Sequence, residues 1–286
     1  MRAKGPLAAA ATGSRLFAGG LWLFTTLGIA APAFADDSTT LAATYMISIT
    51  GVSIGRADVK ARFTDKGYAA AISGSTYGVS RIVSDARATL AGSGRVSGNT
   101  VVPASYNLET SESGLQTSVS MTMRGGAIVG LQAIPTLPQA SDRVPVGALS
   151  RQNVVDPVGA FIVALDRPGA ADGNRACNRV VHVFDGWKRF DIRLSYRETR
   201  PASSGEPDAT VIVCAARYVP IAGHRTSDDS VAYMADNKRL EIWLTPIKGT
   251  RYLVPTRIQI GTKLGDLVIN ARSFDVSGGE RQARAD

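Results

Sequence analysis

Apolar and polar residues alternate with a period of two along most of this chain, which predicts β-strands joined by short turns. In the first such run Tyr45, Ile47 and Ile49 fall on one face, and Met46, Ser48 and Thr50 fall on the other. One polar face per strand is typical of an antiparallel sheet with one solvated side. The strands expected in the first half are 45–50, 57–63, 68–75, 103–112, 115–123 and 127–133, and residues 78–91 fit either a short helix or a strand.

A proline-rich loop at 131–150 separates this half from a second region of alternation. There Asp185-Gly186 lies between two alternating runs, 180–184 and 187–197, and the Asp-Gly pair favours a two-residue type I′ hairpin turn. Pro255 predicts an edge or a bulge in its own strand, because proline cannot donate a ladder hydrogen bond. The remaining strands expected are 212–218, 239–245, 252–260 and 266–276.

One segment has the period of a helix rather than a strand. Asp156 is suited to cap a helix whose first position is Pro157, and Pro168-Gly169 would end it. The apolar residues that would share one face of this helix are Val158, Phe161, Ile162 and Leu165.

Together these elements predict an all-β fold: an antiparallel open barrel, or a strongly curved sheet or sandwich, of about 10 to 12 strands with one short α-helix. A chain of this length can bury roughly 70% of its unfolded surface in one core. We therefore expect a single β-rich domain at 44–276, a flexible lead-in at 36–43 and a disordered tail at 277–286.

The first 35 residues have the pattern of a secretory signal peptide. Sparse positive charge precedes an apolar run at 16–31, and Pro32 is followed by Ala33-Phe34-Ala35. Small residues at Ala33 and Ala35 fit cleavage after Ala35, and the apolar run is shorter than the about 20 residues that span a bilayer. The sequence thus predicts export to the periplasm of a Gram-negative-type envelope, with no transmembrane helix after the signal is removed.

Charge adds little about partners. The chain holds 32 basic and 24 acidic residues, and three of the basic ones lie in the signal region. This mild, dispersed excess is not the footprint of a nucleic-acid-binding protein. Positive residues do recur on one face of the strand 187–197, usually a solvated face but here also a candidate contact surface for anionic lipid or envelope polymer. That candidate surface consists of Arg189, Arg193 and Arg197, with His224 in a nearby loop.

Cys177 and Cys214 are the two cysteines of the chain. In an oxidising compartment such an isolated pair is most simply one disulfide. Both fall on the apolar faces of their predicted strands, as a buried disulfide requires. The alternatives are a metal pair or a reactive thiol.

No catalytic grouping is complete in the sequence. Gly51-Val52-Ser53-Ile54-Gly55 matches the G-x-S-x-G pattern of serine hydrolases, but a strand follows it where the chemistry needs a helix. The two histidines, His182 and His224, are the only bases a hydrolase could use. Residues 228–229 lack the spacing of a calcium loop, and we predict no metal and no cofactor.

Five short motifs occur in an order that resembles the bacterial family called domain of unknown function 3108. They extend over residues 44–276, and the resemblance implies an exported, mostly antiparallel β protein without established catalytic residues. The motifs are Tyr45 leading into Gly51 and Gly55, Pro103-Ala104-Ser105-Tyr106, Val155-Asp156-Pro157, Val183-Phe184-Asp185-Gly186, and Ile242-Trp243-Leu244 ahead of Val254-Pro255-Thr256-Arg257-Ile258.

Three functions follow as hypotheses. The first is a non-enzymatic envelope protein that binds an apolar or amphiphilic ligand, or another envelope component, in the concave face of the sheet. The second is a structural or assembly module that binds a protein partner through its surface. The third is a periplasmic hydrolase that uses His224 or His182. The oligomeric state is left open.

Overall fold

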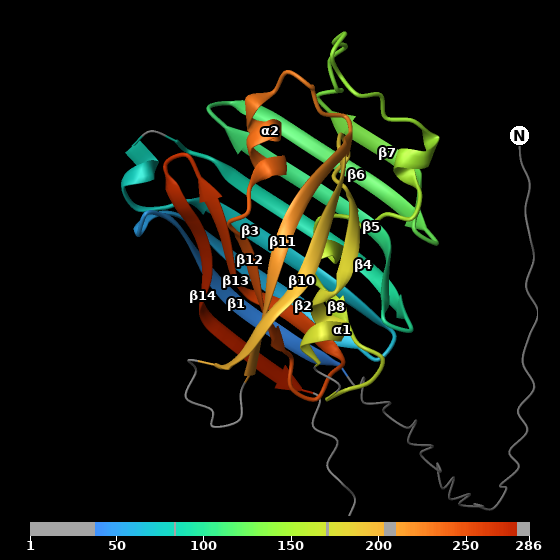
Figure 1. Cartoon of the computed structure of the whole chain (residues 1–286), viewed down its shortest axis with the longest axis vertical. Helices are drawn as coiled ribbons and strands as arrows, with labels where there is room; N and C mark the ends of the chain where they lie inside the picture. The colour runs from blue at the N-terminus through green and yellow to red at the C-terminus, as the bar shows by residue number, and fades with distance from the viewer. Residues whose placement is uncertain (1–37, 83, 170–171, 203–209, 279–286) are drawn as a thin grey trace, which may run out of the picture. The chain divides into compact units, whose positions relative to one another are not determined.

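The computed structural model describes residues 38–82, 84–169, 172–202 and 210–278, so the expected signal peptide at 1–35 lies outside the described residues. The described chain forms a 14-stranded sheet with a few short helices (Figure 1). The strands are β1 (Thr39–Ile49), β2 (Val52–Thr64), β3 (Gly67–Thr76), β4 (Arg87–Ser97), β5 (Thr100–Glu112), β6 (Leu115–Arg124), β7 (Ala127–Ile134), β8 (Val163–Ala164), β9 (Arg179–Phe184), β10 (Arg189–Pro201), β11 (Thr210–Ala222), β12 (Leu240–Pro246), β13 (Tyr252–Thr262) and β14 (Gly265–Gly278). The helices are the 3₁₀ turns η1 (Gly78–Ile82), η2 (Ala148–Arg151) and η3 (Gly159–Phe161), and the α-helices α1 (Gly173–Cys177) and α2 (Asp229–Asp236).

All the strand pairs are antiparallel, and most join strands that follow one another in the chain. The order across the sheet is β7-β6-β5-β4-β3-β2-β1-β14-β13-β12-β11-β10-β9, and β8 pairs with β13 off this path. The first and last strands meet in the middle, where Thr39 lies opposite Gly278. The sheet therefore consists of two meanders joined by one long-range pairing.

The two meanders face each other across an apolar interior. Figure 1 shows β10 to β13 crossing over β2 to β5. Phe63 of β2 stacks on Tyr252 of β13 with ring centroids 4.8 Å apart, and the Tyr252 hydroxyl donates to the carbonyl of Thr64 at 2.8 Å. Tyr45 of β1 likewise donates to the carbonyl of Pro255 at 2.7 Å. Aromatic side chains thus tie the N-terminal meander to the C-terminal one.

A connecting segment at 154–165 lies inside this interior. Val158 and Phe184 belong to one buried cluster with Tyr106 and Met121, whereas Ala164 packs in the cluster around Phe63. The segment also reaches the strands at both edges of the sheet. Val154 donates its backbone N–H to the carbonyl of Gly126, beside β7. Val155 donates its N–H to the carbonyl of His182 in β9, and its own carbonyl accepts from the N–H of Phe184. The sheet does not close on itself, but this segment connects its two edges.

The predicted fold class, an all-β antiparallel open barrel or curved sheet, is confirmed. The strands are more numerous than expected, because β4 forms from the ambiguous region and continues to Ser97, and because β8 was not predicted. Pro255 was expected at a sheet edge or at a bulge. It lies in the interior strand β13, at a register shift in its pairing with β12, so the bulge is what the structure shows.

The helix predicted over 156–165 is wrong. Asp156 accepts backbone N–H groups from Val158 and Gly159, but the element that follows is the three-residue η3, whose N-cap position is Val158. Val163 then pairs with Leu253 of β13. Residues 162–165 are all buried whichever way their side chains point, since the segment is enclosed by both meanders. Phe161, expected on the inner face, is 41% exposed.

The α-helices of the described residues are α1 and α2, and neither was predicted; α1 includes Cys177, which was expected on the apolar face of a strand. Each begins with an aspartate cap: Asp172 accepts from Asn174 N–H, and Asp228 accepts from Ser230 N–H, each at 2.9 Å. The two-residue turn expected at Asp185-Gly186 is also wrong, because Phe184 pairs with Arg189 across a four-residue loop. Asp185 accepts backbone N–H groups from Trp187 and Lys188 in that loop, which stabilises the wider turn.

The sheet also begins earlier than expected. β1 starts at Thr39, inside the segment expected to be a flexible lead-in at 36–43, since Thr39 and Leu41 are buried against the sheet. At the other end β14 runs to Gly278, into the segment expected to be a disordered tail.

Candidate functional site

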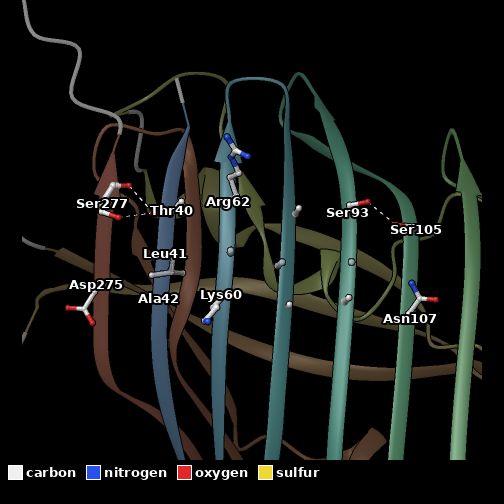
Figure 2. Close-up of a pocket in the computed structure, with 16 residues that line it drawn as sticks. Thr40, Leu41, Ala42, Lys60, Arg62, Ser93, Ser105, Asn107, Asp275 and Ser277 are labelled. Atoms are coloured by element: carbon white, nitrogen blue, oxygen red, sulfur yellow. Dashed lines mark hydrogen bonds between the residues drawn. The ribbon is translucent and has the colours of Figure 1, made fainter. Parts of the chain in front are cut away.

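A shallow groove of about 580 Å³ lies on the outer face of the N-terminal meander. It crosses six adjacent strands, from β14 through β1 to β5 (Figure 2). The face is the outer one because the intervening residues Leu41 and Ala61 point into the core. The groove is therefore separate from the apolar interior, and it lies on the face opposite the concave one for which the sequence suggested a ligand.

Strand register arranges the groove in two rows of side chains. In one row Lys60 of β2, Ala71 of β3, Ala91 of β4 and Asn107 of β5 stand opposite one another. The second row crosses the same four strands and has one serine on β4 and one on β5. It consists of Arg62, Ala69, Ser93 and Ser105.

Small side chains make the floor of this groove. Ala69, Ala71 and Ala91 project only one carbon from β3 and β4, whereas Lys60 on β2 and Asn107 on β5 stand on either side (Figure 2). Strands are spaced about 4.8 Å apart, so these walls are separated by roughly 14 Å. The result is an alanine floor with a cationic wall and an amide wall.

The hydroxyl groups at the rim are largely paired with each other. Ser93 and Ser105 share a hydrogen bond of 2.8 Å between their Oγ atoms, and Thr40 and Ser277 share one of 2.7 Å. Lys60 makes no hydrogen bond or ion pair among the described residues and is exposed. Asp275 of β14 is exposed in the same row, with Ala42 of β1 between it and Lys60, so the groove presents one charge of each sign at this end of its floor.

Asp58, on the same face two residues from Lys60, is committed elsewhere. It accepts from Arg56 at 2.9 Å and from Thr44 at 2.7 Å. The hydrogen bond from Arg56, followed by that from Thr44, lowers the pKa of Asp58, and the charge of Lys60 adds to the effect. Asp58 is therefore held by Arg56 and Thr44, and it is not among the residues that line the groove.

A buried carboxyl group lies on the inner side of the sheet behind this floor. Asp156 is fully buried, and its Oδ1 accepts the backbone N–H groups of Val158 at 2.8 Å and Gly159 at 3.0 Å. Burial raises the pKa of Asp156 to about 6, and the two backbone hydrogen bonds oppose that rise. Its Oδ2 has no hydrogen-bond partner among the described residues.

The Tyr68 hydroxyl is the neighbouring buried polar group, and it is also unpaired among the described residues. Burial raises the pKa of Tyr68, and the nearby charge of Asp156 raises it further. Both groups converge on Gly159, where an added Cβ would lie 2.8 Å from the Tyr68 hydroxyl and 3.0 Å from Asp156 Oδ2. With two backbone bonds and full burial, Asp156 acts on the segment it caps rather than on a substrate.

His182 has the carboxylate partner that a hydrolase would need, but not the hydroxyl. Its Nδ1 lies 2.7 Å from Asp191 Oδ1, which also accepts from Arg189 Nη1 at 2.5 Å. Burial is the largest influence on Asp191 and works to raise its pKa, but the hydrogen bonds from His182 and Arg189 bring it below the usual value. In the described ranges no hydroxyl hydrogen-bonds to His182.

His224 lies in the loop after β11. Its carbonyl accepts from Val144 N–H at 3.0 Å, and its buried Nδ1 has no partner in the part of the chain described. The hydroxyl nearby in sequence, Ser227, bonds to Asp142 together with Arg225, which lies 3.0 Å from the same carboxylate. The hydrogen bond from Ser227, followed by that from Arg225, lowers the pKa of Asp142 to about 2. These contacts hold two loops together and do not converge on the histidine.

The arginines expected to form a contact surface do not make a free stripe. Arg189 is buried against Asp191, and Arg197 pairs with Glu241 at 2.5 Å. Arg193 is exposed. The motif at Gly51–Gly55 is the β1–β2 hairpin expected from the alternation, with Ser53 in β2.

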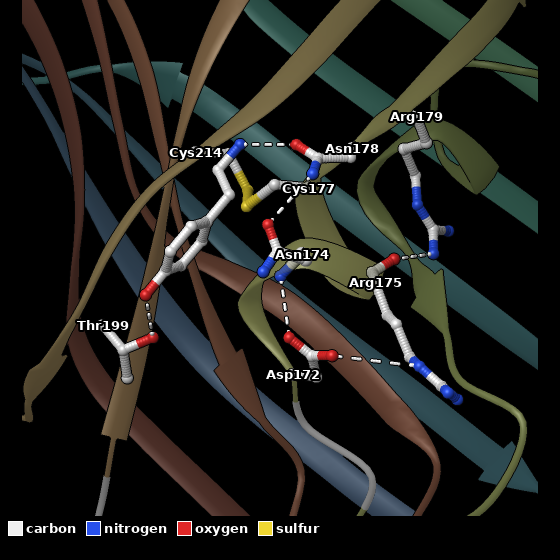
Figure 3. The surroundings of a disulfide bond; sticks show 9 residues. Asp172, Asn174, Arg175, Cys177, Asn178, Arg179, Thr199 and Cys214 are labelled. Carbon is white, nitrogen blue, oxygen red and sulfur yellow. Dashed lines mark hydrogen bonds and ion pairs between the residues drawn. A yellow bond between two sulfur atoms is a disulfide. The ribbon is translucent and has the colours of Figure 1, made fainter.

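Cys177 and Cys214 form the expected disulfide, with sulfur atoms 2.02 Å apart. It joins the end of α1 to β11 inside a buried cluster, and both cysteines are fully buried (Figure 3). Asn178, next to Cys177, accepts from Tyr196 N–H at 2.9 Å, which fixes the end of α1 against β10. The bond is thus structural.

Two further properties bear on the class of site. In the described ranges, no three His, Cys, Asp or Glu side chains gather closely enough to hold a metal ion. None of the described helices has both the length and the apolar character needed to cross a bilayer.

The fold and the groove define an open, curled antiparallel β-sheet protein with a ligand-sized surface depression and without an assembled catalytic centre in its described residues. The chain belongs to the family described as protein of unknown function DUF3108, whose model matches residues 44–272. No curated protein matches the sequence.

A crystal structure of similar fold is that of a beta-barrel-like protein of domain of unknown function DUF1849 from Brucella abortus. The two chains are 9% identical and superpose with a TM-score of 0.47, over 84% of this chain and 98% of that chain.

Proposed function

We propose that this chain is a non-enzymatic binding protein of the cell envelope, and that the groove on the outer face of β1 to β5 holds an anionic amphiphile. The observation that carries the proposal is the alanine floor at Ala69, Ala71 and Ala91 beside the cation of Lys60. An acyl chain gains free energy when it leaves water for an apolar surface, and a phosphate or carboxylate is attracted to an exposed ammonium group. The two halves of such a ligand match the floor and the wall.

The chemistry of the floor argues against a polar ligand alone. Three methyl groups offer no hydrogen bonds, and two of the hydroxyl pairs at the rim already satisfy one another. A ligand without an apolar part would leave the floor unused. A shallow, open groove also fits reversible binding better than enclosure.

The probe for this proposal is palmitoyl lysophosphatidylglycerol, kept below its critical micelle concentration and titrated calorimetrically into the chain from residue 36 onward. Ala71→Leu with Ala91→Leu fills the floor at two outward-facing positions, and we expect at least a tenfold rise in Kd. Ser195→Leu on the outer face of β10 is the matched control, and binding should not change.

Charge reversal supplies the second arm of the test. Lys60→Glu should weaken the binding of lysophosphatidylglycerol but leave the binding of zwitterionic lysophosphatidylcholine nearly unchanged, because only the first lipid carries a net negative charge. Failure of the native protein to bind either lipid would refute the proposal, as would equal binding by the filled variant. If the groove bound a soluble anionic glycan and not the lipid, its ligand would be an envelope polymer, and the proposal of an amphiphile would be overturned.

We propose the periplasm as the place of action. The signal-type N-terminus with Ala33 and Ala35 supports export, and a buried disulfide is typical of proteins that fold in an oxidising compartment. N-terminal sequencing of the protein from a periplasmic extract should begin at Asp36. Recovery of the chain in the cytoplasm with Met1 still present would contradict this location.

A further inference from the structure

Charged side chains of both signs line the groove on the outer face of the sheet. They are Lys60 and Arg62 of β2 and Asp275 of β14. Lys60 and Asp275 are exposed, and neither makes a hydrogen bond or an ion pair with another described residue. Arg62 already has an interaction of its own. The two charges that remain for a ligand are therefore one ammonium group and one carboxylate group.

The groups of the groove follow a fixed order across the sheet. Strand register places Asp275, Ala42 and Lys60 in one row, with Ala42 in the middle (Figure 2). The same row continues through the methyl groups of Ala71 and Ala91. Adjacent strands are about 4.8 Å apart, so the backbones that carry the two charges are about 10 Å apart, and the alanine floor begins about 5 Å beyond Lys60. From β14 to β4 the order is carboxylate, ammonium, apolar floor.

A phospholipid whose head group ends in an amine has complementary groups in the same order. Its ammonium group would lie beside Asp275, its phosphate beside Lys60 and its acyl chain along the alanine floor. Each charge of the groove then meets a charge of opposite sign, and the acyl chain covers the methyl groups. A glycerol head group would leave the carboxylate of Asp275 without a counter-charge.

We propose that Asp275 selects, among anionic amphiphiles, those whose head group carries an ammonium group beyond the phosphate. This inference rests on the proposed function, because it takes the acyl chain to lie on the alanine floor and the phosphate beside Lys60. A phosphoserine head group has this chemistry, since its phosphate, carboxylate and ammonium groups together give a net negative charge. The groove is shallow and open, so the carboxylate of such a ligand stays in water.

The contribution of Asp275 is to specificity rather than to most of the affinity. An exposed pair of opposite charges changes an equilibrium by up to about fivefold. The apolar contact and the cation of Lys60 are common to all the ligands compared, so their effect cancels in a ratio of dissociation constants. The ratio for two lipids of equal net charge is therefore the quantity that reports on Asp275.

Calorimetric titration of two palmitoyl lysophospholipids into the chain from residue 36 onward tests the proposal, with each lipid kept below its critical micelle concentration. Lysophosphatidylserine and lysophosphatidylglycerol carry the same acyl chain and the same net charge at neutral pH, but only the first has an ammonium group. We expect the native protein to bind lysophosphatidylserine about three- to fivefold more tightly. Asp275→Asn keeps the size of the side chain and should make the two Kd values equal, mainly by weakening the binding of lysophosphatidylserine.

Glu109→Gln is the matched control. Glu109 is an exposed carboxylate on the outer face of β5, and it does not line the groove. Its loss changes the net charge of the protein as Asp275→Asn does, but it should leave the ratio of the two Kd values at the native value. Urea unfolding midpoints equal to that of the native protein would show that both variants fold.

The possible results separate the specificity residue from the groove itself. Equal binding of the two lipids by the native protein would overturn the role of Asp275 and leave the proposed function in place. An unchanged preference in Asp275→Asn would also overturn it, because the selectivity would then arise from other residues. If the native protein bound neither lipid, the proposed function would fail and this inference with it.

Discussion

Asp156 is expected to make the protein more stable at pH 4 than at pH 8. Its carboxyl group is fully buried, and its pKa is raised from 3.8 to about 6. Below the unfolded-state value of 3.8 both the folded and the unfolded chain bind the proton, and the stability contributed by the neutral form is complete. Between 3.8 and 6 only the folded state holds the proton, so the free energy of unfolding falls as pH rises, and the contribution is lost above 6.

The size of the effect follows from the shift. One pKa unit corresponds to about 1.4 kcal/mol, so a rise of this extent gives a loss of about 3 kcal/mol between pH 4 and pH 8. Asp156→Asn keeps an oxygen for the two backbone donors and carries no charge. The variant should therefore match the wild type near pH 4 and exceed its stability by up to about 3 kcal/mol at pH 8.

Urea unfolding followed by tryptophan fluorescence at intervals from pH 4 to pH 8 measures both curves. The informative quantity is the difference between wild type and variant, because other titrating groups contribute equally to both. Asp172→Asn is the control, since Asp172 is an exposed helix cap and asparagine caps as well as aspartate. Parallel curves for wild type and Asp156→Asn over this pH range would refute the reasoning.

Three further predictions concern packing and covalent structure. Replacing Cys177 and Cys214 by serine should lower the free energy of unfolding by about 4 kcal/mol, given a sequence separation of 37, and a midpoint unchanged by reduction would contradict this. Gly159→Ala should destabilise the fold by about 1–3 kcal/mol, because the new methyl group would press on the Tyr68 hydroxyl, and thermal melting would detect the loss. Phe63→Ala should cost about 3–5 kcal/mol through the cavity left in the core, and chemical denaturation that showed less than 1 kcal/mol would argue against the packing described.

The sequence predicted the strands well because alternation in an antiparallel sheet depends on local positions alone. In β1 Leu41, Ala43 and Tyr45 are buried in alternation, as the period of two requires. The same rule failed at 156–165, where both faces of the segment are buried and helical spacing of apolar residues carries no information about secondary structure. It failed again at Asp185, where a side-chain hydrogen bond to the backbone widened the turn.

The candidate groove could not be found from local pattern. Ala71, Ala91 and Lys60 are ordinary exposed residues until the register of three strands places them opposite one another. The small residues at 69–71 were the available signal, but small side chains on a polar face have no single meaning without a register. The disulfide was predictable because the chain has two cysteines, although Cys177 lies at the end of α1 and not on the strand face expected for it. The connection between the edges at Val154 required the three-dimensional path of the chain.

The pairing of β1 with β14 has a consequence for biosynthesis. These strands come from the two ends of the described chain, yet they lie in the middle of the sheet, with Thr39 beside Gly278. Their pairing spans nearly the whole sequence, so the central ladder can form only after the last strand has been synthesised, and such distant contacts make folding slow. It also follows that deletion of β14 would divide the sheet at its centre rather than trim an edge.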